Sequence, residues 1–278
     1  MVTSTHSGLS VPDWPTTYGH SMFLFPLESM VGGIFYEHGH RLIASIVGLL
    51  TIGLVVFIWR ADSRRWMVRL GVIALAVVIL QGVLGGLTVL YFLPAPISIG
   101  HAGIAQFFFC VTVAIALFTS AGWRRPAVAP VDDSRAREWA TVLTLAIYAQ
   151  ILIGATMRHL GAGLAIPDFP LAFGRLLPPA WPLPVAIHFA HRVGAVIIIL
   201  LVVAVARVIW SRHSDRRELT RPAMALLIAV TIQATLGALV VLTLKQPIIN
   251  TLHVATGAVV LAASLVLTLR TYRVRFGG

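Results

Sequence analysis

The chain has 278 residues, of which 58% are hydrophobic and only 11% are charged, and its mean hydropathy is +0.89. About a quarter of the residues in a soluble domain are charged, so this composition excludes an ordinary soluble protein. The formal net charge is +11, but most arginines lie in short loops between apolar runs, which is a signal of membrane topology and not of nucleic-acid binding. One cysteine, Cys110, excludes an intrachain disulfide.

Seven stretches are long and apolar enough to cross a membrane, since a span needs about 20 mostly apolar residues. They are predicted at about 36–59, 70–92, 98–120, 139–157, 186–209, 223–244 and 251–270. The fold class is therefore an all-α polytopic membrane protein, surrounded by lipid.

Arginine distribution predicts the orientation of these spans, because positively charged loops stay in the cytoplasm. The arginine-rich segments, predicted to be cytoplasmic, are 60–69, 121–138, 207–222 and the C-terminal tail. The segments with little positive charge, predicted to face outward, are 1–35, 93–97, 158–185 and 245–250.

The second half of the chain repeats the first. Gly8–Pro15 reads Gly-Leu-Ser-Val-Pro-Asp-Trp-Pro, and Gly163–Pro170 reads Gly-Leu-Ala-Ile-Pro-Asp-Phe-Pro. Each loop precedes a helix headed by a His-Arg pair, and a glutamine-containing span and a further histidine follow in the same order. Because the halves have the same orientation, we expect two bundles related by a pseudo-twofold axis along the membrane normal. The predicted division is 1–120, a cytoplasmic linker 121–138, and 139–278.

One span breaks the repeat. The stretch 139–157 precedes the Pro-Asp loop of the second half, and the first half has no counterpart. This predicts a parent protein with eight spans, four in each bundle, whose first helix is missing from this sequence.

Four histidines occupy matched positions near the outer ends of their spans: His40, His101, His191 and His253. Within each half the two histidines lie on different helices at similar depth. Two imidazoles on facing helices of a bundle can bind the two faces of a heme. The alternative is four polar packing residues bonded to neighbouring carbonyls, but the repetition favours ligands, since ionisable groups at membrane depth are generally functional.

Other polar residues allow two interpretations each. Arg41 and Arg192 directly follow ligand candidates and could bind heme propionates or extend to the membrane interface. The Pro-Asp loops could be plain turns or lids over the bundle ends.

For Gln81 and Gln233 we expect interhelical hydrogen bonds. For Gly82 and Gly86, with their counterparts Ala234 and Ala238, close helix–helix contact is favoured over room for a porphyrin. His38 should face away from His40, and the unmatched loop histidines are His6, His20, His159 and His213.

Taken together, the Glu-His-Gly-His-Arg segment at Glu37–Arg41, the Ser7–Pro15 loop, the segment Gln81–Thr88 and the repeated histidines resemble the heme A synthases. The resemblance covers nearly the whole chain. It implies eight helices in two pseudo-symmetric halves, one holding a heme b cofactor and the other the substrate heme O. The implied reaction oxidises a porphyrin ring methyl to a formyl group, giving heme A for terminal oxidases. Many bacterial members carry an outer cysteine pair that this chain lacks.

The resemblance also implies roles for individual residues. Glu37 corresponds to the essential carboxylate, and the heme-ligand histidines are His40, His101, His191 and His253. His188 replaces Glu37 in the second half, where a histidine suits the surroundings of a fixed cofactor. This asymmetry assigns substrate heme O to His40 and His101, and the iron of heme b to His191 and His253. A heme O synthase is the implied supplier of substrate, and the chain is compatible with a homo-oligomer.

Two other classes of function remain open from the sequence. One is a diheme b-type electron carrier that interacts with quinol, and the other is a transporter whose histidines relay protons. The single carboxylate beside one histidine pair disfavours a carrier with two equivalent hemes. The pairing of histidines at equal depth disfavours the transporter.

Overall fold

The computed structural model describes residues 2, 4, 5, 7–124 and 133–273. These residues form helices and irregular loops, with no β-strand among them. The helices long and apolar enough to cross a membrane are α1 (Gly32–Ala61), α2 (Arg65–Leu90), α3 (Ala95–Thr119), α5 (Ser134–His159), α6 (Leu183–His213), α7 (Arg217–Leu242) and α8 (Pro247–Thr271). The short elements are η1 (Leu27–Ser29), α4 (Ala121–Arg124) and η2 (Ala162–Leu164). The seven predicted spans and the all-α class are confirmed.

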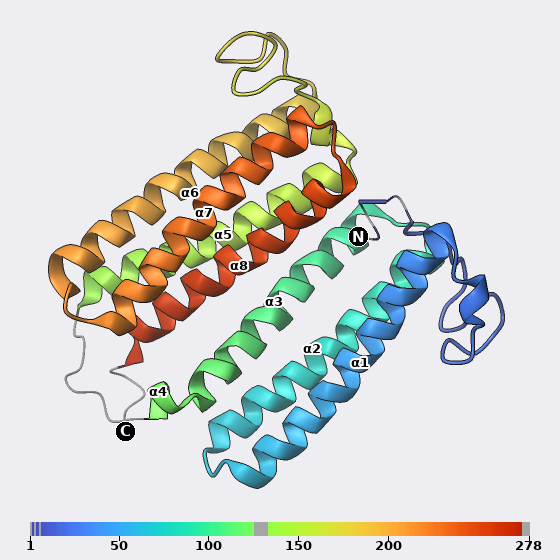
Figure 1. Cartoon of the computed structure of the whole chain (residues 1–278), viewed down its shortest axis with the longest axis horizontal. Coiled ribbons are helices and arrows are strands. Elements are labelled where there is room, and N and C mark those ends of the chain that lie inside the picture. Colours follow the sequence, from blue (N-terminus) through green and yellow to red (C-terminus); the bar gives the residue numbers. More distant parts are fainter. Residues whose placement is uncertain (1, 3, 6, 125–132, 274–278) are drawn as a thin grey trace. The chain divides into compact units, whose positions relative to one another are not determined.

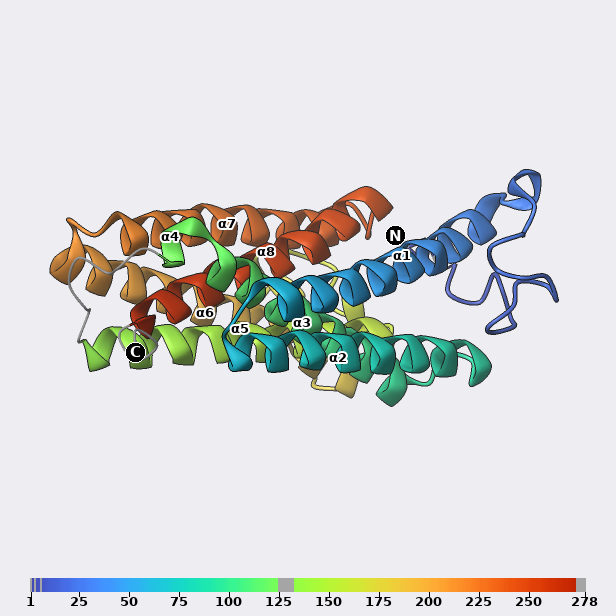
Figure 2. The ribbon, with the colours of Figure 1, turned by 90° about the horizontal axis from the view of Figure 1, so that it is seen from below.

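The chain divides into two compact units, Met1–Val111 and Thr112–Gly278. In the second unit α5, α6, α7 and α8 form a four-helix bundle in which each helix packs against the next and α8 closes onto α5 (Figure 1). In the first unit α1 and α2 pack as an antiparallel pair, and Figure 2 shows them diverging away from their connecting turn. The predicted linker residues 125–132, the tail 274–278 and His6 lie outside the described residues.

The helices carry large apolar side chains on several faces, as expected where lipid is the surrounding solvent. Leu50 and Leu200, for example, are exposed, whereas Met67 and Leu226 are buried. Polar side chains add contacts between α5 and α8. The Thr268 hydroxyl donates to the Ala140 carbonyl at 2.8 Å and lies 2.8 Å from the Thr144 hydroxyl. Small hydroxyl side chains of this kind let two helices pack closely within a membrane.

Asp133 fixes the start of α5 at the arginine-rich end of the bundle. Its carboxylate caps the helix by accepting from the Ala136 amide at 3.1 Å, and it lies 3.1 Å from His213 Nε2 and 3.3 Å from an Arg212 nitrogen. Burial opposes ionisation of Asp133, but these hydrogen bonds and the arginine charge outweigh it and lower its pKa. The last turn of α6 is thereby joined to the first turn of α5.

Candidate functional site

The loop before α1 is built around the Asp13 side chain. Its carboxylate accepts hydrogen bonds from the amides of Tyr18 at 2.8 Å and Gly19 at 2.9 Å, and from the Thr16 hydroxyl. Burial opposes ionisation, but the hydrogen bonds outweigh it and lower the pKa of Asp13 to about 2. Tyr18 and Gly19 both have positive φ angles, which turn the chain back so that both amides point at the carboxylate.

We expect this loop to open only in strong acid. Because the pKa of Asp13 falls from 3.8 to about 2 on folding, its contribution to stability is complete above about pH 4 and is lost as the pH falls through about 2. Hydrogen exchange at the Tyr18 and Gly19 amides, corrected for intrinsic rates, should show protection at pH 5 that disappears near pH 2. Asp13→Asn should lose much of that protection at neutral pH. Full protection in this variant would contradict the role given to the carboxylate.

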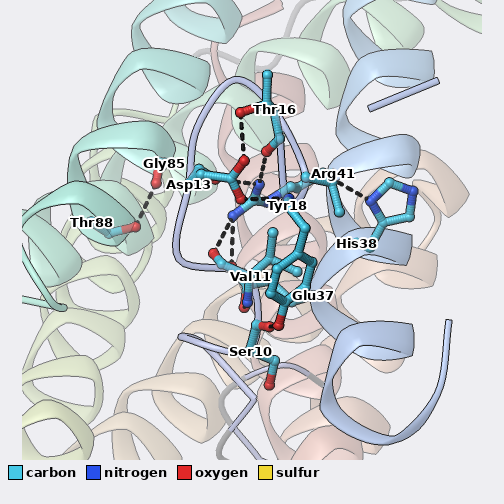
Figure 3. Close-up of polar contacts among 11 residues, drawn as sticks. Ser10, Val11, Asp13, Thr16, Tyr18, Glu37, His38, Arg41, Gly85 and Thr88 are labelled. Carbon is cyan, nitrogen blue, oxygen red and sulfur yellow. Dashed lines mark hydrogen bonds and ion pairs between the residues drawn. The ribbon is translucent and has the colours of Figure 1, made fainter. Parts of the chain in front are cut away.

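Arg41 on α1 holds the loop against this helix by hydrogen bonds. Its guanidinium donates to the carbonyl oxygens of Asp13 at 2.7 Å, Thr16 at 2.9 Å and Val11 at 2.8 Å (Figure 3). It also donates to Glu37 at 2.8 Å, and the second Glu37 oxygen accepts from the Val11 amide at 2.9 Å. Glu37 is only 3% exposed and Arg41 only 9%. Removing one member of such a buried ion pair leaves the other charge uncompensated.

The loop before α6 repeats this arrangement. The Asp168 carboxylate accepts from the amides of Phe173 and Gly174, each at 2.7 Å. These backbone hydrogen bonds lower the pKa of Asp168. Arg192 donates to the carbonyls of Asp168 at 2.7 Å and Ile166 at 3.1 Å. The sequence repeat is therefore also a repeat of individual hydrogen bonds, in loops that each contain a cis Xaa-Pro peptide.

His188 takes the place of Glu37 in this second arrangement. Its Nδ1 lies 3.2 Å from the Ile166 amide nitrogen, and its Nε2 lies 3.2 Å from Arg192 Nε. A neutral imidazole accepts through one nitrogen only, so it accepts one of these two hydrogen bonds at a time. The predicted match between His188 and Glu37 is confirmed in position, and both side chains join a loop amide to the neighbouring arginine. The chemical difference is that Glu37 supplies a carboxylate and His188 an imidazole.

Arg41 and Arg192 are thus engaged with loop carbonyls, a role that the sequence analysis did not consider, and their proposed contact with propionates stays a prediction. His38 faces away from His40, as predicted: its Nδ1 lies 3.0 Å from the Thr17 hydroxyl, and its ring packs on Phe25. Each Pro-Asp loop is held against the first turns of its helix and not left as a plain turn.

In the second unit, the rings of His191 and His253 face each other from α6 and α8. Their centroids are 6.5 Å apart and their planes lie at 79°. A metal ion about 2.0–2.1 Å from one nitrogen of each ring separates two imidazole centroids by roughly 6 Å. Both side chains are half-buried, and His253 Nδ1 is buried without a hydrogen-bond partner in the described part of the chain. The two side chains are close enough that they would together hold one metal ion between them.

The described residues contain no cluster of three or more His, Cys, Asp or Glu side chains that could hold a bare metal ion. A pair of imidazoles instead suits a metal that brings its own ligands, as the iron of a heme does. In the first unit His40 is exposed on α1 and His101 is half-buried on α3. These two positions match the His191 and His253 positions in the repeat.

The expected interhelical hydrogen bond of Gln81 is confirmed, since its Nε2 lies 3.3 Å from His101 Nε2 on α3. The prediction of close helix–helix contact at Gly82 and Gly86 is wrong. A Cβ added at Gly82 would meet nothing within 4 Å, whereas one at Gly86 would lie 2.5 Å from the Trp14 ring. Gly86 therefore admits the aromatic side chain of Trp14 from the loop before α1, which a pattern of small residues along one helix does not reveal. We call this loop and its counterpart before α6 the capping loops.

Gln150 on α5 was missed by the sequence analysis. Its Nε2 lies 3.1 Å from His191 Nδ1 and 2.7 Å from the His191 carbonyl oxygen. The available signal was a glutamine followed four residues later by a glycine, a spacing that Gln81 and Gln233 share.

Fold and site together define a multi-pass helical membrane protein with an internal repeat that presents two histidines, on two helices, in each half. The chain matches the family of cytochrome oxidase assembly proteins, COX15-CtaA, over residues 1–265, and it belongs to this family.

Among similar proteins, the heme A synthase of Symbiobacterium thermophilum is 34% identical over 86% of this chain and 78% of its own length. That of Halalkalibacterium halodurans is 29% identical over 91% and 84%, and that of Alkalihalophilus pseudofirmus is 27% identical over 97% and 90%.

Proposed function

We propose that this membrane enzyme is a heme A synthase, which oxidises a ring methyl of heme O to the formyl group of heme A for terminal oxidases. The observation that carries the proposal is the pair of facing imidazoles of His191 and His253, 6.5 Å apart. The relatives named above, all of them heme A synthases, support the same activity. Neither the quinol-linked electron carrier nor the transporter receives support from these relatives.

The resident cofactor in this proposal is a heme b in the C-terminal half, residues 139–278. His191 and His253 would bind its iron, and when bound it supplies one-electron transfer. His188 stands one turn before His191 and holds the capping loop without adding a negative charge. A neutral neighbour of this kind suits a permanent cofactor.

The N-terminal half, residues 1–120, would bind the substrate heme O through His40 and His101. Its distinguishing group is Glu37, a buried carboxylate one turn before His40. Converting a methyl to a formyl group removes four electrons and adds one oxygen atom, so the reacting carbon becomes electron-poor and protons must leave. A fixed carboxylate can stabilise that positive charge or accept a proton. Arg41 and the Val11 amide hold this carboxylate in one orientation.

Pigment extraction from the purified full chain tests the proposal. A heme A synthase should yield heme b together with heme O or heme A. A carrier with two equivalent hemes would yield heme b alone, and a transporter would yield none. Co-purification with a heme O synthase, and the size of the assembly in detergent, would test the proposed supplier and a homo-oligomer.

The orientation of the bundle can be tested by labelling. Arginine asymmetry predicts that segments 121–138 and 207–222 and the C-terminal tail face the cytoplasm and that segment 158–185 faces outward. In a Cys110→Ser background, we expect an impermeant thiol reagent added from outside to modify a cysteine at Leu176, which is 84% exposed. A cysteine at the exposed Ser214 should react only after the membrane is opened. The reverse pattern would overturn the orientation.

A further inference from the structure

The same two-residue unit occurs on three helices. A glutamine and a glycine four residues apart lie one turn apart on one face of a helix. The units are Gln81 with Gly85 on α2, Gln150 with Gly154 on α5, and Gln233 with Gly237 on α7. In each case the next long helix carrying a candidate heme ligand presents its histidine to this face.

The glycine of each unit has no side chain, and this leaves space for the edge of the imidazole ring. We call this space the glycine seat. A Cβ added at any of the three would lie 2.9–3.2 Å from the histidine Cε1, closer than ordinary van der Waals contact. The pairs in contact are Gly85 with His101, Gly154 with His191, and Gly237 with His253. Gly82, on the same helix as Gly85, has nothing within 4 Å of an added Cβ. The close approach of His101 is therefore made at Gly85 and not at Gly82.

The glutamine of each unit lies beside the same histidine. Gln150 contacts both His191 Nδ1 and the His191 carbonyl. It fits because residue 194 is glycine: a Cβ there would overlap Gln150 Oε1. In the first unit Gln81 Nε2 lies 3.3 Å from His101 Nε2.

The third unit shows the same approach through a different contact. A Cβ added at Gly257, one turn beyond His253 on α8, would lie 3.2 Å from Gln233 Nε2. The amide of Gln233 therefore lies against the backbone of α8 beside the histidine. Glycine on the histidine helix makes room for the glutamine here, as Gly194 does for Gln150.

We propose that these three Gln-Gly units are positioning residues for the heme-ligand histidines, with the glycine setting the place of each ring and the glutamine its rotation and proton. The inference rests on the proposed function, because it takes His101, His191 and His253 as ligands. A neutral imidazole that binds a metal through one nitrogen carries its proton on the other. In this structure the Gln150 amide nitrogen, a donor, faces His191 Nδ1. A half-turn of the amide group would bring Oε1 to Nδ1 in place of the hydrogen bond to the His191 carbonyl, so that Gln150 accepts that proton once the ring is a ligand. Accepting it raises the basicity of the ligand.

Equilibrium redox titration of the purified holoprotein tests the role of Gln150. Gln150→Leu removes the acceptor, so the midpoint potential of heme b should rise and heme should be lost about 10–100-fold more readily to apomyoglobin. Gln150→Glu keeps the length and offers a stronger acceptor, so the potential should fall below that of the wild type. Thr156→Val, on the same helix, removes a hydroxyl that donates to the Leu152 carbonyl and should leave the potential unchanged. Equal shifts in the same direction for both Gln150 variants would overturn the proposal.

The glycine seat is tested by a pair of substitutions on α2. Gly85→Ala places a methyl group against His101 and should lower heme O retention, measured as bound heme per protein after incubation with heme O. Gly82→Ala adds the same methyl group in open space and should retain wild-type binding. Equal retention in the two variants would exclude the seat.

Failure of the proposed function would look different. If the wild-type protein carries no heme, or if His191→Ala keeps its b-type spectrum, the histidines are not ligands. If that spectrum depends on His191 but the Gln150 variants keep the wild-type potential, the ligand assignment stands and the positioning role fails.

Discussion

Replacing His253 by alanine should reduce the b-type heme of the purified protein to background while the protein stays in the membrane. The described residues hold no group of three or more His, Cys, Asp or Glu side chains around His191 and His253, so one substitution would remove one of the only two residues proposed to hold the iron. His191→Ala should have the same effect. The measurement is the reduced-minus-oxidised spectrum with heme quantified as its pyridine complex, and heme A formation should stop as well.

Histidines outside this pair supply the controls. His213→Ala removes an imidazole of α6 that lies beside Asp133 at the opposite end of the bundle, and it should keep the b-type spectrum. His40→Ala and His101→Ala should lose product formation but also keep the b-type spectrum. Loss of that spectrum from His40→Ala or His101→Ala alone would show that the two halves have been assigned in reverse.

The spans and the repeat could be predicted from sequence because both depend on local patterns. Apolar runs of about 20 residues mark helices in a membrane regardless of what packs beside them. The matched loops, His-Arg pairs and later histidines keep their order in both halves. The all-α fold and the position of each helix followed directly.

Contacts between distant residues were harder to predict. Arg41 bonds to the loop carbonyl of Asp13, far away in sequence, and an arginine beside a histidine gives no sign of whether it serves a loop, a propionate or the membrane interface. Gly86 admits Trp14 from the same loop, although the sequence suggested contact with another helix. In both cases the partner lies in an irregular loop, where hydropathy periodicity gives no orientation.

The structure adds a second role for Glu37. The carboxylate holds the capping loop through the Val11 amide and completes the bonding of Arg41, so loss of activity on its removal could arise from an open loop or from missing chemistry. Glu37→Gln should stop heme A formation while leaving the b-type spectrum. This variant does not separate the two roles, since it weakens the ion pair and removes the charge together.

The second half supplies the variant that separates them. The imidazole of His188 stands between its loop and Arg192, with one ring nitrogen 3.2 Å from the Ile166 amide nitrogen and the other 3.2 Å from Arg192 Nε. Glu37→His should therefore keep the first loop docked, seen as preserved protection of the Tyr18 amide from hydrogen exchange, yet lack the carboxylate. If the carboxylate takes part in oxidation, heme A formation should fall about 10²–10⁴-fold, the usual contribution of a positioned acid or base. Wild-type heme A formation by a Glu37→His protein with a docked loop would limit Glu37 to holding the loop.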